Sequence, residues 1–354
     1  MANYVHPTFS RKTRFLLFLQ GMMDLGRLLQ ALMLAGLIII VAAPMVYLAY
    51  ASPVIFVVVA VAIGLVLRSA IRSSFRKTLS ENERSAEIPG KHEFAQSFER
   101  TAQWMLNNRK SLIATDYIWM WWFVNKAALL TGDSRLIEMV DEFKHEKYEV
   151  RGTPRDFGHL LLEPGQAYTY NEEGFRQSVH FLQLILYGLT GNKEAGASRY
   201  VQDQYDPDFS DGETARDIRA ACLTHQVMGL HEIQTAGYCA DAGDHDELLR
   251  ELQLKMRYLL TLDPAAGDVY FQRVMMLVMT GARDQVKPVW FRRILEAQQP
   301  DGGWLLYQSM TRLTPGFRLG MGLRFPRLHR DGSAFHSSAQ GLLLMAMMMQ
   351  DKTP

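Results

Sequence analysis

The sequence predicts an all-α fold, in which an N-terminal two-helix transmembrane hairpin precedes a ring of about five helical hairpins. Two observations support this class. Residues 28–67 are two long uncharged runs joined by a short break, and the rest of the chain repeats apolar runs that end in glycine. We find no convincing alternation of apolar and polar residues of the kind that marks a strand. The 354 residues suffice for one large domain and an accessory segment.

The composition excludes several classes of partner and chemistry. Lys and Arg number 38 against 37 Asp and Glu, so we expect no nucleic-acid partner. The two cysteines form no CxxC or Cys/His spacing, so we expect neither a disulfide framework nor a metal site. Nineteen methionines indicate an adaptable apolar interior. No nucleotide-binding or hydrolase signature is present, and the cofactor therefore stays unassigned.

Residues 1–77 are predicted to anchor the protein in a membrane. The basic residues 1–27 fit an interfacial segment. The uncharged run 28–50 is long enough to span a bilayer, whereas 54–67 is short and must tilt or borrow flanking residues. Basic residues flank the hairpin at both ends and are missing from its turn. The positive-inside rule then predicts a bacterial-type inner membrane protein with both termini and the globular domain in the cytoplasm.

A polar linker, 78–92, is expected to lead into a helical-repeat domain at 93–354. Four glycines in this domain end apolar runs at intervals of 44–59 residues, which fits one helical hairpin per repeat. They are Gly132, Gly191, Gly237 and Gly281. A glycine just past a helix is the usual left-handed stop.

Two kinds of helix are expected to alternate along this domain. Amphipathic outer helices are predicted at about 93–108, 134–146, 194–205, 245–261 and 285–299. More apolar inner helices are predicted at about 115–131, 173–189, 214–236, 268–280 and 335–350. Closure into a ring gives an (α/α) toroid, and an open solenoid of helical pairs is the alternative. Glycines inside the inner helices (Gly188, Gly229 and Gly341) permit close helix packing.

The long connections indicate where a site should lie. Connections from outer to inner helices are long, especially 147–172 and 300–334, and in a ring they gather on the rim where inner helices begin. Carboxylates there can cap helices, or act in pairs as acid and base. Acidic and histidine residues at these starts are Asp116, Glu172, Glu173, Asp211, Glu213, Asp217, Asp268, Asp331 and His336. Of these we predict Asp268, His336, Asp331 and Asp116 as catalytic.

The segment 288–304 carries a resemblance to a known family. It predicts a helix that stops at Pro300, followed by a turn that returns Trp304 onto the helix end. This resembles the QW repeat of terpenoid cyclases and, more loosely, protein prenyltransferase β subunits and other α/α toroids. Those subunits place zinc ligands, Asp-x-Cys and His, at inner-helix starts, which Asp268 and His336 match. Tyr270 replaces the cysteine, so a tetrahedral zinc set is incomplete.

Substrate-binding candidates fall into two groups. Five arginines interleaved with apolar residues occur in 310–330 without an acid: Arg312, Arg318, Arg324, Arg327 and Arg330. Arginine binds phosphate bidentately and basic-apolar segments dock on anionic leaflets, although a solvated loop is the simpler interpretation. The cavity and rim candidates are Trp119, Trp122, Tyr168, Tyr170, His225, Tyr270, Arg273 and Trp304.

The resulting functional hypothesis is a membrane-tethered cytoplasmic (α/α) toroid. It would bind or process a lipid-like or phosphorylated substrate, such as an isoprenoid-linked one, in its central cavity, with anionic lipid or a phosphorylated small molecule as ligand. One alternative is a non-catalytic helical subunit or scaffold of an inner-membrane complex, with membrane-protein partners. Another is a glycan lyase or hydrolase. Whether the protein is an enzyme stays open, because no complete catalytic constellation is visible.

Overall fold

The computed structural model describes residues 46, 52–115, 117–151, 162, 180–192, 196–206, 222–237, 242–263, 266–306, 309–314, 317–321, 326–330 and 332–350. The predicted first membrane span lies outside the described residues, except for Val46. Five candidate site residues also lie outside them: Asp116, Tyr168, Tyr170, Arg324 and Asp331.

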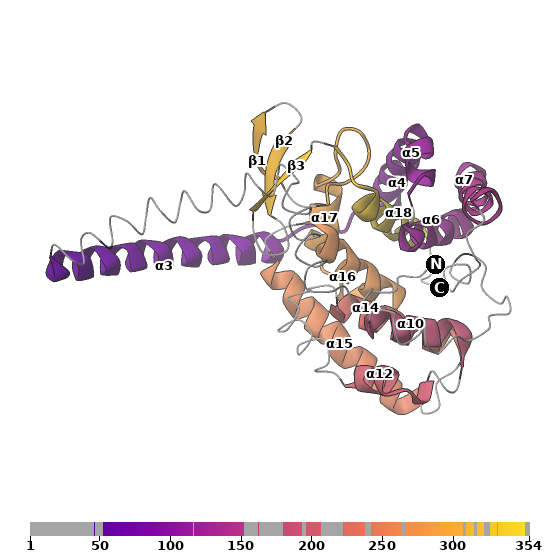
Figure 1. The fold of residues 1–354 in the computed structure, drawn as a ribbon, viewed down its shortest axis with the longest axis horizontal. Helices are drawn as coiled ribbons and strands as arrows, with labels where there is room; N and C mark the ends of the chain where they lie inside the picture. Colours follow the sequence, from indigo (N-terminus) through magenta and orange to yellow (C-terminus); the bar gives the residue numbers. More distant parts are fainter. Residues whose placement is uncertain are drawn as a thin grey trace, which may run out of the picture.

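The chain reaches the helical body through α3 (Pro53–Glu83), a helix of 31 residues that projects beyond the packed helices (Figure 1). Its first position is a proline, whose fixed φ suits a helix start. The helix contains the predicted second span, 54–67, and continues into the predicted linker, of which only 84–90 is non-helical. Among the described residues, no helix combines the length and the apolarity needed to cross a membrane.

The body consists mainly of α-helices that alternate as the sequence predicts. The inner helices are α6 (Ile118–Thr131), α10 (His180–Thr190), α14 (Cys222–Ala236), α16 (Asp268–Met279) and α18 (Phe335–Met349). The outer helices are α4 (Lys91–Asn107), α7 (Ser134–Lys144), α12 (Arg199–Gln202), α15 (Ala242–Leu262) and α17 (Pro288–Glu296). Shorter helical segments are α5 (Arg109–Ile113), η1 (His145–Val150), η2 (Asp203–Tyr205) and η3 (Arg283–Gln285). The mainly α-helical class is confirmed.

The four predicted glycine stops are confirmed. Gly132, Gly191, Gly237 and Gly281 all have positive φ, between 59° and 79°. A residue with a Cβ pays a steric cost in this left-handed conformation, so glycine follows α6, α10, α14 and α16 and redirects the chain after each.

The inner helices pack in a continuous series in which α10 contacts α14, α14 contacts α16, α16 contacts α18, and α18 contacts α6 (Figure 1). Thus the last inner helix lies against the first. The three predicted close approaches are also present. A Cβ on Gly188 would lie 2.9 Å from the backbone of Ile233, one on Gly229 2.7 Å from Leu184, and one on Gly341 2.5 Å from the Trp304 ring.

The helix–turn–Trp segment folds as expected. Trp304 is fully buried, and its indole Nε1 donates to the carbonyl oxygen of Ile294 in α17 at 2.9 Å. Its backbone N–H donates to Ser338 Oγ at the start of α18, also at 2.9 Å. Gln298, which our sequence interpretation did not use, donates to Ser97 and Gly302 and so joins the turn to α4. The turn therefore ties α4, α17 and α18 together.

The connection 300–334 contains strands, so the expectation of a strand-free domain was wrong. Strands β1 (Ser309–Thr314), β2 (Phe317–Met321) and β3 (Pro326–Arg330) form one antiparallel sheet in the order β1-β2-β3. Thr314 pairs with Phe317 across the Pro315-Gly316 connection. A Pro-Gly pair between two short segments is a signal for a β-hairpin, and our sequence interpretation did not use it because the surrounding pattern predicted helices.

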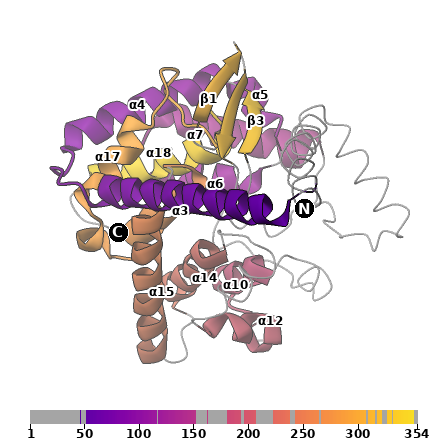
Figure 2. The same cartoon turned by 90° about the vertical axis from the view of Figure 1, so that its left-hand side faces the viewer.

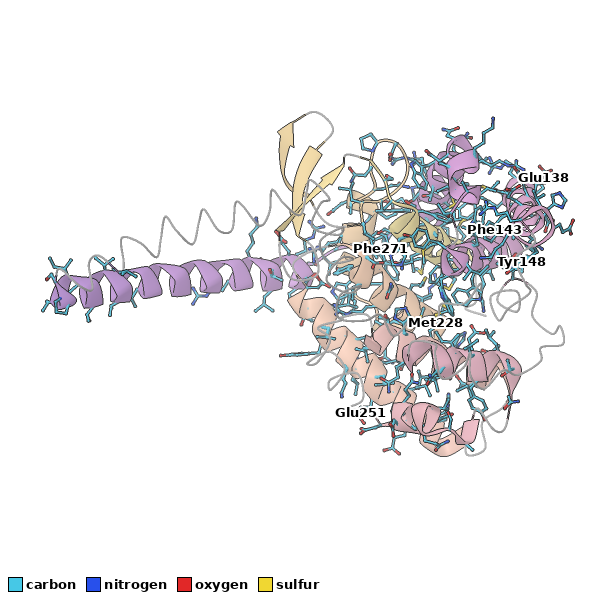
Figure 3. All side chains as sticks on the ribbon, viewed as in Figure 1. Glu138, Phe143, Tyr148, Met228, Glu251 and Phe271 are labelled. Atoms are coloured by element: carbon cyan, nitrogen blue, oxygen red, sulfur yellow. The ribbon has the colours of Figure 1, made fainter. Side chains whose placement is uncertain are left out.

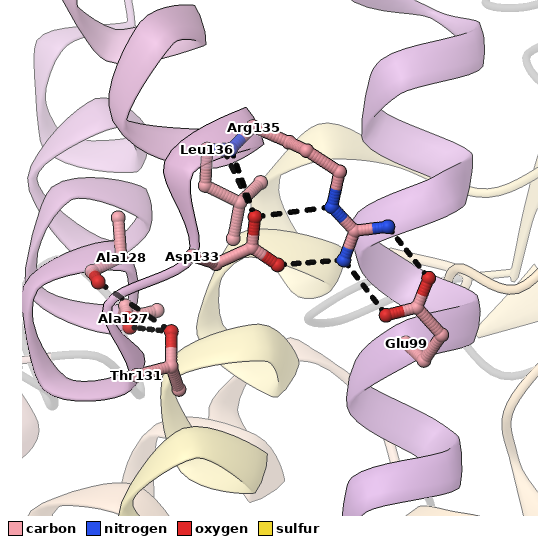
Figure 4. Close-up of polar contacts among 7 residues, drawn as sticks. All are labelled: Glu99, Ala127, Ala128, Thr131, Asp133, Arg135 and Leu136. Carbon is pink, nitrogen blue, oxygen red and sulfur yellow. Dashed lines mark hydrogen bonds and ion pairs between the residues drawn. The ribbon is translucent and has the colours of Figure 1, made fainter.

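An ion cluster fastens α7 to α4 (Figure 4). Arg135 binds both carboxylate oxygens of Glu99 at 2.7 Å and also pairs with Asp133 at 2.6 Å. Asp133 in turn caps α7 by accepting the backbone N–H of Arg135 at 3.0 Å. Hydrogen bonding to Arg135 holds the pKa of both carboxyl groups, Glu99 and Asp133, below the usual range.

Candidate functional site

A cavity of about 230 Å³ lies among four inner helices. Its lining comes from the N-terminal parts of α6, α14 and α18 and from the middle of α16, which are far apart in the sequence. The lining residues are Tyr117, Trp119, Met120, Phe123, Thr224, His225, Met228, Gln272, Met275, Met276, His336 and Gln340. The first turns of α6, α14 and α18 thus meet at one cavity, together with the middle of α16.

The two best-matched candidates, Asp268 and His336, are in direct contact. Asp268 Oδ1 lies 2.9 Å from His336 Nδ1, although 68 positions separate the residues in the sequence. Asp268 opens α16 and His336 stands in the first turn of α18, and the contact between these two helices brings the side chains together. His336 lines the cavity with 37% of its side chain exposed, while Asp268 lies behind it at 16%.

A chain of polar contacts holds Asp268 in place. Gln272, one turn further along α16, donates from Nε2 to Asp268 Oδ1 at 3.3 Å. Thr224 of α14 donates to Gln272 Oε1 at 2.6 Å. Three inner helices thus contribute to orienting one imidazole, as in acid–base sites where a carboxylate fixes the tautomer of a histidine.

Gln340, on α18 one turn after His336, is the most unusual residue of the lining. It is completely buried. Within the described part of the chain, neither its Nε2 nor its Oε1 has a hydrogen-bond partner. Buried side-chain amides are nearly always paired, so this exception requires an explanation.

The remainder of the lining is mainly apolar. The apolar wall consists of Met228 of α14 (labelled in Figure 3), Met275, Met276, Trp119 and Phe123. His225 and Trp119, both predicted from the sequence to bind substrate, are among the lining residues. No lysine or arginine occurs among the described lining residues. The site therefore combines an apolar wall with a polar edge formed by His336, Gln272 and Gln340.

This arrangement has the parts for hydrogen bonding and proton transfer. A neutral His336 that donates its Nδ1 proton to Asp268 presents Nε2 as an acceptor, the geometry of a general base. The zinc site implied by the prenyltransferase resemblance does not fit. Asp268 and His336 bond each other, Tyr270 directs its hydroxyl to Asn82, and no group of three or more metal-binding side chains occurs among the described residues.

Tyr270 and Arg273, predicted to bind substrate, lie at the junction of α3 with the body instead. The Tyr270 hydroxyl donates to Asn82 Oδ1 at 3.3 Å, and Arg273 pairs with Asp263 at 2.7 Å. Burial raises the pKa of the Tyr270 phenol. Burial also lowers the pKa of Arg273, and the negative charge of Asp263 acts in the opposite direction on that group. Both residues face away from the described cavity lining because successive helical positions turn by about 100°.

Two aromatic candidates belong to the core. Trp304, expected near the rim, is fully buried against Phe271 with ring centroids 5.4 Å apart. Trp122 is 1% exposed and lies under the ammonium group of Lys126, 4.7 Å from the ring centroid. A ligand cannot reach either ring in this arrangement, so only Trp119 of the three tryptophans proposed for binding faces the cavity.

Four of the five candidate arginines fall on the small sheet. Arg312 pairs with Arg318 between β1 and β2, and Arg318 pairs with His329 between β2 and β3. Arg327 pairs with Gly320 and Arg330 with Phe317. The backbone register thus sets Arg312, Arg318 and His329 in one row across the three strands. Both views place the sheet on the side of the body from which α3 projects (Figures 1 and 2).

Sequence reasoning missed Gln272 and Gln340. A signal was available, because each lies four residues after a predicted site residue, Asp268 or His336, and positions i and i+4 share a helix face. The methionines of the wall had no comparable signal, since their positions also suit an ordinary core.

Comparison with protein families, with curated proteins and with solved structures finds no match.

Proposed function

We propose that this protein is a membrane-tethered helical protein that binds a lipid-like ligand in the cavity at the inner-helix starts. The Asp268–His336 pair at the edge of an apolar cavity carries the proposal. A histidine that is oriented by a carboxylate, next to a mainly apolar wall, is suited to a ligand that has an apolar portion and one polar end group. His336 would contact that end as a hydrogen-bond acceptor and general base.

The cavity volume limits the ligand. At about 230 Å³ it falls below the roughly 300–1,000 Å³ of typical ligand pockets, but an apolar cavity of about 150 Å³ holds benzene. The described cavity therefore suits a small molecule or one end of a longer chain. An isoprenoid-linked lipid would place only its terminal part inside.

The membrane tether is supported by the surface of α3. Val54, Val58 and Leu65 are 72%, 62% and 60% exposed, and other apolar residues of the same helix are exposed beside them. Contiguous exposed apolar surface marks a protein or membrane contact. The arginine-bearing strands on the same side of the body suit anionic headgroups or a phosphorylated group of the ligand. The uncharged run 28–50 is long enough to supply a membrane-spanning helix.

We further propose that the hairpins form an (α/α) toroid of the kind suggested by the terpenoid cyclase and prenyltransferase resemblance. The contact of the last inner helix, α18, with the first, α6, supports closure. A complete ring would also bring α6 against α10, across a part of the chain that lies largely outside the described residues.

The glycan-cleaving alternative has less support. Glycoside hydrolysis requires two carboxyl groups that flank the scissile bond. The described cavity residues include no carboxylate, and Asp268 lies behind His336. A non-catalytic scaffold in a membrane complex is the competing function, and the ligand experiment separates it from the proposal.

The experiment measures lipids retained by the full-length protein. We expect mass spectrometry of protein purified in mild detergent to find a retained lipid-like molecule, and less of it in the His336→Ala and Asp268→Asn variants. A scaffold would retain only the bulk lipids of the membrane, in equal amounts in all variants.

His145→Ala is the matched control. His145 also bonds a carboxylate, Glu149 at 2.6 Å, but the pair is exposed on η1. The His145→Ala variant should retain the same lipids, in the same amounts, as the wild type. Equal retention by His336→Ala and wild type contradicts the proposed site.

A further inference from the structure

Several hydrogen-bonding atoms at the edge of the cavity are available to a ligand, and their donors and acceptors indicate which chemical group the ligand carries there. Gln340 offers an amide NH₂ group as donor and a carbonyl oxygen as acceptor, neither of them paired within the described residues. His336, with Nδ1 engaged by Asp268, offers Nε2 as a further acceptor. Both side chains line the same cavity and stand one turn apart on α18.

Gln340 differs from the other buried glutamines in that both of its amide atoms lack a partner within the described residues. Gln226 of α14 is equally buried and its Oε1 is likewise unpaired there, but its Nε2 donates to the carbonyl oxygens of Gln204 at 2.7 Å and Asp206 at 3.0 Å. Gln272 donates to Asp268 and accepts from Thr224. Leaving a buried amide unpaired is unfavourable, so Gln340 is expected to be paired by something that enters the cavity.

Resting on the function proposed above, we propose that Gln340 and His336 together recognise a hydroxyl group on the apolar end of the ligand. A hydroxyl can donate to His336 Nε2 while accepting from Gln340 Nε2, which matches the donors and acceptors of the cavity edge. A carboxylate or phosphate accepts only, and the described lining holds no lysine or arginine to balance its charge. An ammonium group would be buried among methionines and aromatic rings, and the described lining residues include no carboxylate. The group inside the cavity is therefore neutral.

Four matched aromatic probes test this selectivity. They are 4-fluorobenzyl alcohol, 4-fluorobenzoate, 4-fluorobenzylamine and 4-fluorotoluene, each with one ring that suits the cavity volume. Binding to the full-length protein in nanodiscs is measured by ¹⁹F NMR line broadening and corrected for empty nanodiscs. We expect the alcohol to bind about five- to tenfold more tightly than the toluene, since one good hydrogen bond accounts for such a factor. The two charged probes should bind more weakly than either.

The decisive variant is Gln340→Met, which keeps the length of the side chain and removes its polar atoms. We expect this variant to lose the preference for the alcohol, to retain 4-fluorotoluene, and to melt at or above the wild-type temperature. Gln226→Met is the matched control and should melt lower, because two carbonyl oxygens lose a donor, while the alcohol preference stays.

The outcomes separate the two proposals. Equal binding of alcohol and toluene by the wild type, or an unchanged alcohol preference in Gln340→Met, overturns the role of Gln340 and leaves cavity binding intact. Tighter binding of the benzoate overturns the assignment of a neutral group. Failure of all four probes to bind removes the proposed ligand cavity and this inference with it.

Discussion

At the scale of single residues, Arg135 shows how one side chain can join two helices. It binds Glu99 of α4 and Asp133 at the start of α7, and the pKa of each carboxyl group is lowered by this hydrogen bonding. Arg135 and Glu99 are 41% and 56% exposed, so solvent screens the pair. Exposed ion pairs typically contribute less than about 1 kcal/mol. The cluster therefore positions α7 more than it stabilises the protein.

The cluster makes stability depend on pH. A carboxyl group with a lowered folded-state pKa stabilises the protein above its unfolded-state value and loses this contribution as pH falls through the folded value. We expect Arg135→Gln to lower the free energy of unfolding at pH 7, by up to about 1 kcal/mol per pair. The difference from wild type should shrink below about pH 4, where unfolded carboxyl groups protonate. Chemical denaturation at pH 7, 5 and 3.5 measures this.

Lys77→Gln is the control for that experiment. Lys77 is 78% exposed and lies 3.8 Å from Glu81, so its removal should change stability little at any of the three pH values. An Arg135→Gln difference that stays constant from pH 7 to 3.5 would show that the cluster does not act through these carboxylates.

At the scale of helices and turns, the segment from α17 to α18 determines the position of the cavity. The Trp304 side chain and backbone bond to α17 and α18, and Gly341 of α18 leaves room for its ring. The first turn of α18 carries His336, and Gln340 immediately precedes Gly341. The depth at which Trp304 inserts thus sets where both cavity residues stand.

Gly341→Ala tests this packing. Its Cβ would lie 2.5 Å from the Trp304 ring, and overpacking a core costs about 1–3 kcal/mol. Alanine is otherwise about 1 kcal/mol better than glycine inside a helix. We therefore expect Gly341→Ala to lower the melting temperature in the wild type and to raise it in a Trp304→Phe background, where the clashing ring atoms are absent. The same effect in both backgrounds would rule out the contact as the cause.

At the scale of the whole molecule, α3 is attached to the body by a buried polar junction. Asn82 is fully buried and donates to the carbonyl oxygens of Thr261 and Asp263, while Arg293 and Tyr270 donate to its Oδ1. Arg84 binds Glu296 through both carboxylate oxygens, at 2.6 and 2.7 Å. A helix whose apolar part is exposed is therefore held firmly at its other end, which suits a rigid tether.

Reporter fusions test the tether and its orientation. With two spans, a cytoplasmic reporter should be active at the C-terminus, and a periplasmic reporter only when inserted at the Ala51-Ser52 turn. A periplasmic reporter that is active at the C-terminus would reverse the proposed orientation and favour the glycan-cleaving alternative.

The sequence by itself determined the order and class of the helices, the glycine stops and the return of Trp304, because these follow from local periodicity and from backbone conformations that only some residues tolerate. It also marked Asp268 and His336 as residues at helix starts. Only the tertiary structure decided that these two bond each other, that Gln340 next to them has no partner among the described residues, and that Tyr270, Arg273, Trp122 and Trp304 lie elsewhere. The physical reason is that the side a helix turns to its neighbours depends on contacts between residues far apart in the chain, which local patterns do not encode.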